Sequence, residues 1–173
     1  MGSTDVYTNQ LIKKEALENG NVVVVDVPGC ESENVAAAFD CGVKKARGSY
    51  ILFANAAEEL ETDGLSVMLA EIDNGRNFEI VLSNAEIGGE MPQVIDNYKI
   101  ITAVAGKNAM TNVKEVLPNV KDLIAGDANV LYRRSFLEKH KLSHQGRMPF
   151  IEKAMQESRK LAVVPFVGCK FYR

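Results

Sequence analysis

The chain has 173 residues, a hydrophobic share of 46% and a formal net charge of −3. This length predicts one domain, 1–173, with enough apolar side chains to bury a core. The interspersed charges exclude the basic stripe of an electrostatic nucleic-acid binder. No apolar run reaches the roughly 20 residues of a membrane span, and the opening residues lack the basic and apolar regions of a secretory signal. We therefore expect a cytoplasmic protein without a transmembrane segment.

The first half of the chain alternates helix and strand patterns. Helices are predicted where an apolar stripe ends at a glycine or an Asn-Gly pair, at residues 4–19, 34–47 and 64–73. Strands are predicted at β-branched or apolar runs, at residues 21–27, 50–54 and 78–83. This alternation predicts an α/β fold with a mostly parallel sheet and helices on both faces. Val24 and Leu52 are expected in its core.

The pattern breaks at residues 84–127, which contain two prolines and a Gly-Gly pair without a clean period. We interpret this segment as an excursion with short helices at 112–117 and 120–124; such excursions often carry binding function. The regular pattern then resumes. It predicts a strand at 128–134, a short helix at 135–141 capped by Ser135, a helix at 149–158 and a last strand at 161–166.

Cysteine and histidine usage gives no sign of a metal or disulfide framework. The three cysteines, Cys30, Cys41 and Cys169, are odd in number and match no zinc spacing, which favours reduced thiols. His140 and His144 have a spacing that could hold a metal on a helix. However, the pattern around them indicates a loop, so we expect a surface pair.

Several motifs, in this order, resemble the family 2 glycosyltransferases of GT-A fold. The chain opens with "GSTD" before a helix, where the family has an Asp-Gly-Ser-Thr-Asp turn. It continues with "AFDCGVKKARGSYILFANAAE" (38–58), "VLYRRSFLEKHKL" (130–142), "GRMPFIEKAM" (146–155) and the closing "VVPFVGCKFYR". Each motif alone is weak, but their order and spacing cover nearly the whole chain. The resemblance implies a GT-A-like, Rossmann-like fold and a nucleotide-sugar donor.

The departures from the family concern its metal site. The family's Asp-x-Asp holds Mg²⁺ or Mn²⁺ against the donor diphosphate, and these positions are Asn55 and Ala57 here. Glu58 follows and is the remaining candidate metal ligand. The resemblance and the strand ends leave Asp26 and Asn55 as candidate nucleotide contacts. Asn55 could equally be a turn residue, and Glu58 a helix-start acid.

The departures also concern the catalytic base and the start of the fold. The family base falls at Arg147, and a guanidinium cannot accept a proton at pH 7. The catalytic residues are therefore unknown. Arg133 and Arg134 could bind a diphosphate, or form surface ion pairs. The first strands of the family have no counterpart, so we expect a shortened domain without its first βαβ portion.

Three functions fit these observations. The first is a glycosyltransferase-like domain of cell-envelope or polysaccharide synthesis with weak or lost catalysis. The second is an active transferase with relocated carboxylates, for which Glu58, Asp40 and Glu90 are candidates. The third is a non-catalytic interaction module completed by a second copy or a strand-donating partner. The expected location is the cytoplasm, with the inner face of the membrane as an option, and the expected cofactor is Mg²⁺ or Mn²⁺ with a nucleotide diphosphate-sugar, or none.

Overall fold

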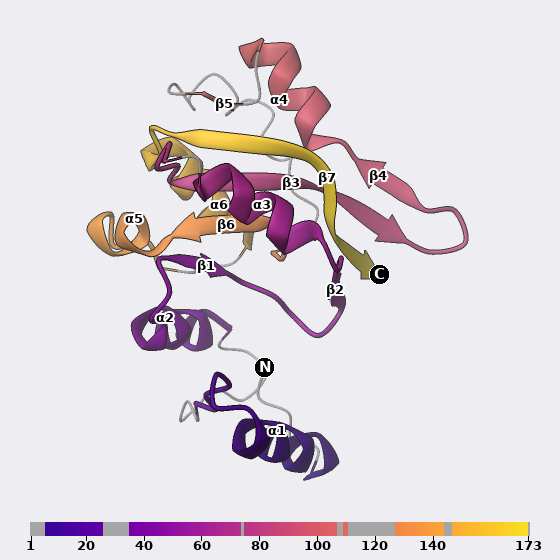
Figure 1. Cartoon of the computed structure of the whole chain (residues 1–173), viewed down its shortest axis with the longest axis vertical. Helices are drawn as coiled ribbons and strands as arrows, with labels where there is room; N and C mark the ends of the chain where they lie inside the picture. Colours follow the sequence, from indigo (N-terminus) through magenta and orange to yellow (C-terminus); the bar gives the residue numbers. More distant parts are fainter. Residues whose placement is uncertain are drawn as a thin grey trace. The chain divides into compact units, whose positions relative to one another are not determined.

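The structure is a computed structural model of the whole chain (Figure 1). The residues that it describes are 6–25, 35–73, 75–106, 109–110, 127–143 and 147–172. The chain divides into two compact units, Met1–Ala46 and Arg47–Arg173. Among the described residues, no helix is long and apolar enough to cross a membrane.

The first unit contains two helices, α1 (Val6–Glu18) and α2 (Val35–Lys45). Both confirm the predicted helices. The valine run that follows α1 forms no strand over residues 22–25, so the predicted strand is wrong there. Val24 is 41% exposed, so its predicted place in the core is wrong as well. A β-branched run becomes a strand only where a neighbour supplies hydrogen bonds, and no described strand pairs with it.

The second unit is built on one mixed sheet. Its strands are β1 (Tyr50–Leu52), β2 (Glu58–Leu60), β3 (Ile80–Gly88), β4 (Gln93–Ile95), β5 (Ala109–Met110), β6 (Val130–Arg133) and β7 (Leu161–Tyr172). The order is β1-β6-β3-β7-β2, with β4 paired to β3 and β5 to β7. Among the strand pairs that the structure describes, only β3 and β7 run parallel, and the other pairs are antiparallel. The mostly parallel sheet was therefore wrong, because an apolar run indicates burial and not direction.

Helices cover both faces of this sheet, as predicted. On β6, successive side chains point to opposite faces. Leu131 packs in a cluster with Met68 of α3 (Gly64–Asp73), whereas the ring of Tyr132 lies 5.2 Å from that of Phe150 on α6 (Arg147–Glu157). The bounds of α3 agree with the prediction. The centre of the core is the start of β3, where Ile80, Val81 and Leu82 are fully buried.

The predicted excursion begins as part of the sheet. Strand β3 continues past Ser83 to Gly88 and returns as β4, and α4 (Asn97–Ala105) follows. The side chain of Asp96 caps α4 by accepting from Lys99 N, and Gly106 ends the helix with a left-handed φ of 69°. The two helices expected at 112–117 and 120–124 lie outside the described residues.

Strand β3 exchanges neighbours midway. Residues 80–82 pair with β6, residues 85–87 pair with β4 on the same side, and the ladder to β7 shifts register at Ser83 and Asn84. Strand β7 changes partners in the same way, from β5 at its start to β2 at its end. We call this crossing of ladders, around Ser83, Asn84 and Gly168, the strand-exchange junction.

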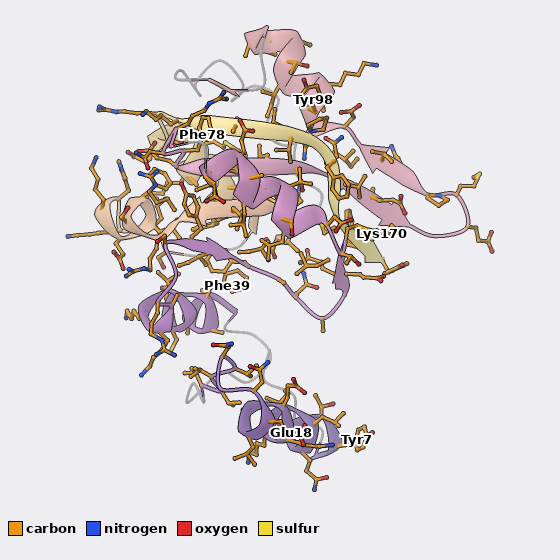
Figure 2. All side chains as sticks on the ribbon, in the orientation of Figure 1. Tyr7, Glu18, Phe39, Phe78, Tyr98 and Lys170 are labelled. Atoms are coloured by element: carbon orange, nitrogen blue, oxygen red, sulfur yellow. The ribbon has the colours of Figure 1, made fainter. Side chains whose placement is uncertain are left out.

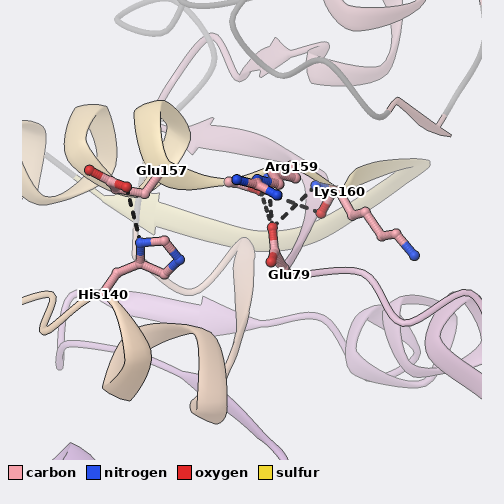
Figure 3. Close-up of polar contacts among 6 residues, drawn as sticks. Glu79, His140, Glu157, Arg159 and Lys160 are labelled. Carbon is pink, nitrogen blue, oxygen red and sulfur yellow. Dashed lines mark hydrogen bonds and ion pairs between the residues drawn. The ribbon is translucent and has the colours of Figure 1, made fainter.

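At the end of the sheet where β3 begins, Glu79 binds the backbone that leads into β7 (Figure 3). Its Oε2 accepts hydrogen bonds from Arg159 N at 2.6 Å, Lys160 N at 3.3 Å and Ser158 Oγ at 3.3 Å. This one oxygen holds the turn between α6 and β7. Nearby, His140 Nδ1 lies 3.0 Å from a carboxylate oxygen of Glu157.

Helix α5 (Arg134–Lys139) follows β6 directly, with Arg133 at its N-cap position and no side-chain cap, so the predicted cap at Ser135 is wrong. His140 therefore follows a helix end, and its predicted partner His144 lies outside the described residues.

Candidate functional site

The candidate site lies where β1 ends and turns into β2. Asn55 forms a side-chain-stabilised turn: its Oδ1 accepts from Ala57 N at 2.9 Å, and its carbonyl oxygen accepts from Glu58 N at 3.1 Å. The residues that follow form strand β2 and not the expected helix start. The carboxamide of Asn55 is thus engaged in shaping the turn.

Glu58 ties this turn to the start of β6. One carboxylate oxygen, Oε2, accepts from Asn55 N at 3.1 Å, and the other, Oε1, accepts from Asp127 N at 2.7 Å. Hydrogen bonds from backbone amides to a carboxylate are stronger than bonds between neutral groups. Glu58 therefore joins two segments that are 69 residues apart in sequence.

Two carboxylates define the electrostatics of the site. Burial, followed by the negative charges of Glu58 and then Asp127, raises the pKa of the Cys169 thiol to about 12. Burial also raises the pKa of Tyr132, with a smaller contribution from Asp127. Asp127 thus lies close enough to act on both side chains. A buried thiol with a raised pKa is a poor nucleophile at neutral pH.

The residues present do not fit a divalent metal ion. Hard cations take six or more oxygen ligands, of which carboxylates carry the charge. Ala57 has no ligand atom, Asn55 Oδ1 already accepts from a backbone amide, and both oxygens of Glu58 are engaged. Among the described residues, no group of three or more His, Cys, Asp or Glu side chains is arranged to hold a metal.

The predicted arginines lie at the other end of β1 and β6. The register pairs Tyr50 with Arg133, so the guanidinium of Arg133 bonds to Tyr50 Oη at 3.1 Å and to Asn77 Oδ1 at 3.0 Å. Arg134 donates to Gly48 O at 2.9 Å and pairs with Glu138. The structure therefore does not bring these arginines to Asn55 and Glu58.

The remaining predicted residues also lie apart from this turn. Asp26 and Cys30 lie outside the described residues, as does the side chain of Arg147. Asp40 belongs to the first unit, and Glu90 is exposed in the turn between β3 and β4.

Sequence reasoning missed Asp127. Its signal was an acidic residue just before the predicted strand "ANVLYRR", a position at which a strand end can meet the turn of a neighbouring strand.

Taken together, the mixed sheet, the helices on both faces and the polar turn after β1 define a GT-A-like domain. No protein-family model matches the sequence, and no curated protein matches it. Solved structures do match. TarS of S. aureus shares this fold.

The match extends along the whole chain. The crystal structure of TarS residues 1–349 with UDP-GlcNAc has a TM-score of 0.74 and 17% identity, covering 99% of this chain and 47% of that one. The structure with UDP has a TM-score of 0.72 and 17% identity, covering 99% of this chain and 48% of that one. A further TarS 1–349 structure has a TM-score of 0.73 and 16% identity, covering 99% of this chain and 49% of that one. The chain thus spans about half the length of these structures. At this identity the likeness establishes the fold, which agrees with the resemblance seen in the sequence.

Proposed function

We propose that the chain is a glycosyltransferase-like domain that binds a nucleotide sugar and has weak or no transfer activity. One observation carries the proposal: the turn after β1 lacks the two family carboxylates, and Glu58 is engaged by two backbone amides. The TarS structures with UDP-GlcNAc and UDP support the choice of ligand class.

Calorimetric titration tests this proposal. UDP and UDP-GlcNAc are titrated into the protein with Mn²⁺ and, separately, with a chelator. We expect binding that the chelator does not abolish, and no release of UDP from UDP-GlcNAc over hours. Turnover that disappears with chelator would contradict lost catalysis, and absence of binding under either condition would contradict the ligand class.

A second candidate is an active transferase with relocated ligands. The hydrogen bond from Asp127 N to Glu58 Oε1 favours it, because it brings a second acidic residue next to the turn; a cation could bind there only if Glu58 released its backbone amides. This alternative predicts metal-dependent UDP binding that Asp127→Asn abolishes. Glu152→Gln, which removes an exposed charge on α6, is the matched control and should leave binding unchanged. Metal-independent binding in all three proteins excludes the alternative.

Restoring the family carboxylates tests the register of the site. Asn55→Asp with Ala57→Asp should create Mn²⁺ affinity and lower the stability of the metal-free protein, because three close carboxylates repel one another. Adding Arg147→Asp would place a carboxylate at the family base position. Unchanged Mn²⁺ affinity, with circular dichroism like that of the wild type, would mean that Asn55 and Ala57 are not the metal positions.

The interaction-module alternative rests on the first unit. Val23 and Val24, which lie outside the described strands, are 60% and 41% exposed. Light scattering during gel filtration tests it: a second copy that completes the sheet would give a dimer, which Val23→Lys with Val24→Lys should dissociate. A monomer at all concentrations removes the homo-oligomer from this alternative.

A further inference from the structure

The strand-exchange junction contains a group of buried polar side chains that the proposed function does not use. They are Ser83, Asn84, Asn97 and Asn129, with exposed fractions of 0%, 8%, 0% and 0%. Buried polar atoms of proteins are almost always hydrogen-bonded, so each exception calls for an explanation. The group lies where β3 leaves β6 and has not yet met β4.

The carboxamide nitrogens of Asn97 and Asn129 both have a hydrogen-bond acceptor. Both carboxamides donate to one carbonyl oxygen, Ser83 O: Asn97 Nδ2 at 2.6 Å and Asn129 Nδ2 at 3.1 Å. Ser83 N in turn donates to Asn129 O at 3.0 Å. Rotating either carboxamide by half a turn would place its oxygen against Ser83 O, a contact between two acceptors. The orientation of both amides therefore follows from the hydrogen bonds.

The acceptors are not all assigned. Within the part of the chain that the structure describes, Asn97 Oδ1 and Asn129 Oδ1 are buried without a hydrogen-bond donor. The neighbouring Asn84 differs, because its Oδ1 accepts from Tyr98 N at 2.9 Å. Two of three similar side chains thus present a free acceptor to the interior.

We propose that internal water occupies the strand-exchange junction and donates a hydrogen bond to each of Asn97 Oδ1 and Asn129 Oδ1. Water suits the site because it brings two O–H donors, and buried waters bind to polar groups that would otherwise be unsatisfied. A metal cation does not suit it, since the uncommitted side-chain acceptors number two and hard cations take six or more ligands. A larger ligand is excluded, because Asn97 and Asn129 have no solvent-exposed surface.

The position of the site gives the water a structural purpose. A shift of register leaves ladder groups without partners, and here side chains replace the missing strand at Ser83. The carboxamides satisfy its carbonyl oxygen but bring two oxygens of their own into the interior. Water completes this set of bonds, so that the sheet can change neighbours without an unsatisfied acceptor.

A crystal structure at atomic resolution, together with water-to-amide magnetisation transfer in solution, tests this inference on the wild-type chain. We expect an ordered water within about 3 Å of each of the two oxygens, and transfer to both carboxamides with the sign of a long-lived water. Asn84 Oδ1 is the internal control, because Tyr98 N already occupies it. A dry oxygen at either asparagine, or a protein N–H or O–H in contact with it, would overturn the inference.

The variant Asn97→Leu provides a second readout. It keeps the shape of the side chain and removes its oxygen, so the water signal at Asn97 should vanish while that at Asn129 persists. If the variant does not fold, the wild-type measurement alone decides. A water that remains beside residue 97 of a folded Asn97→Leu protein, without contact to Asn129 Oδ1, would show that Asn97 does not hold it, and would overturn its role.

Discussion

At each end of the sheet one glutamate joins separate segments of the chain, and the two glutamates differ in how their carboxylate oxygens accept hydrogen bonds. Glu79 gathers its donors on a single oxygen and holds a single turn. Glu58 uses both oxygens, one for each of two distant segments, beside Asp127 and a buried thiol. The difference shows that a carboxylate at a candidate site can be committed to the scaffold. A carboxylate that lies next to a family motif is therefore not necessarily free to bind a ligand.

The largest expected effect comes from a comparison of the closely packed Gly168, at the strand-exchange junction, with Gly42 on α2 of the first unit. At Gly168 a Cβ would collide with Ser83 Oγ, and Gly64 already approaches Gly168 closely. We expect Gly168→Ala to lower the free energy of unfolding by about 2–3 kcal/mol through overpacking, measured by urea denaturation. Gly42→Ala on α2 is the control: a Cβ there meets nothing within 4 Å, and alanine should stabilise the helix by about 0.5–1 kcal/mol. Equal effects would contradict the crowding.

The comparison of the two glutamates can be tested directly. Hydrogen bonds to a charged acceptor contribute about 1.5–3 kcal/mol, and less where water reaches them, so Glu58→Ala, with part-buried bonds, and Glu79→Ala, with exposed backbone bonds, should both destabilise the fold. Glutamine should rescue only position 79, because its one carbonyl oxygen can replace Oε2 there. At position 58 the amide nitrogen would face a backbone N–H. Thermal unfolding of the four variants gives the answer, and an equal rescue at both positions would remove the distinction.

An alkaline pH dependence is expected at the Glu58 end. The pKa of Cys169 lies at about 12 in the folded protein, above its ordinary value of 9.0. The unfolded chain therefore loses this proton first, and its contribution to stability is present below pH 9.0 and lost as pH rises toward 12. The slope expected from this one thiol is at most about 1.4 kcal/mol per pH unit. Tyr132 acts in the same direction, because its pKa is also raised.

Urea midpoints between about pH 8 and 10.5, in a Cys30→Ser background, check this slope. Cys169→Ala should flatten it, whereas Cys41→Ala, at a half-buried position on α2, should not. A slope that Cys169→Ala leaves unchanged would assign the alkaline loss to other groups.

The smallest effect is expected outside the sheet. Val24→Ala should change the free energy of unfolding by less than about 0.5 kcal/mol, as at most surface positions. Val81→Ala, at a fully buried position of β3, should cost about 2 kcal/mol. A comparable cost at both positions would mean that the valine run is covered after all.

Helices were predictable because their signals are local. Helix α3 has its apolar period and its Asn-Gly end within a few residues, and its bounds agree with the structure. The strands at Tyr50 and Val130 were equally visible as apolar runs. Their antiparallel pairing could not be predicted, because an apolar run does not indicate the direction of the neighbouring strand.

The continuation of β3 could not be predicted for a different reason. Ser83 and Asn84 look like a polar strand end, yet the strand passes through them. Their polar groups are satisfied by Asn97, Tyr98 and Asn129, which are distant in sequence. The same limit applied at the candidate site, where the partner of Glu58 is a backbone amide of Asp127. The loss of carboxylates was readable from the sequence, whereas the use made of Glu58 was not.

The exchange of neighbours along β3 and β7 also divides the sheet into two parts that should differ in local stability. Residues 80–82 and 161–164 are fully or nearly fully buried, whereas β3 beyond Ala85 and the last residues of β7 are only partly covered. Amide hydrogen exchange should therefore be slowest at the start of the two long strands and faster beyond the junction. The hairpin of β3 and β4, with β2 and the end of β7, should open as a sub-global unit while the inner half of the sheet stays closed.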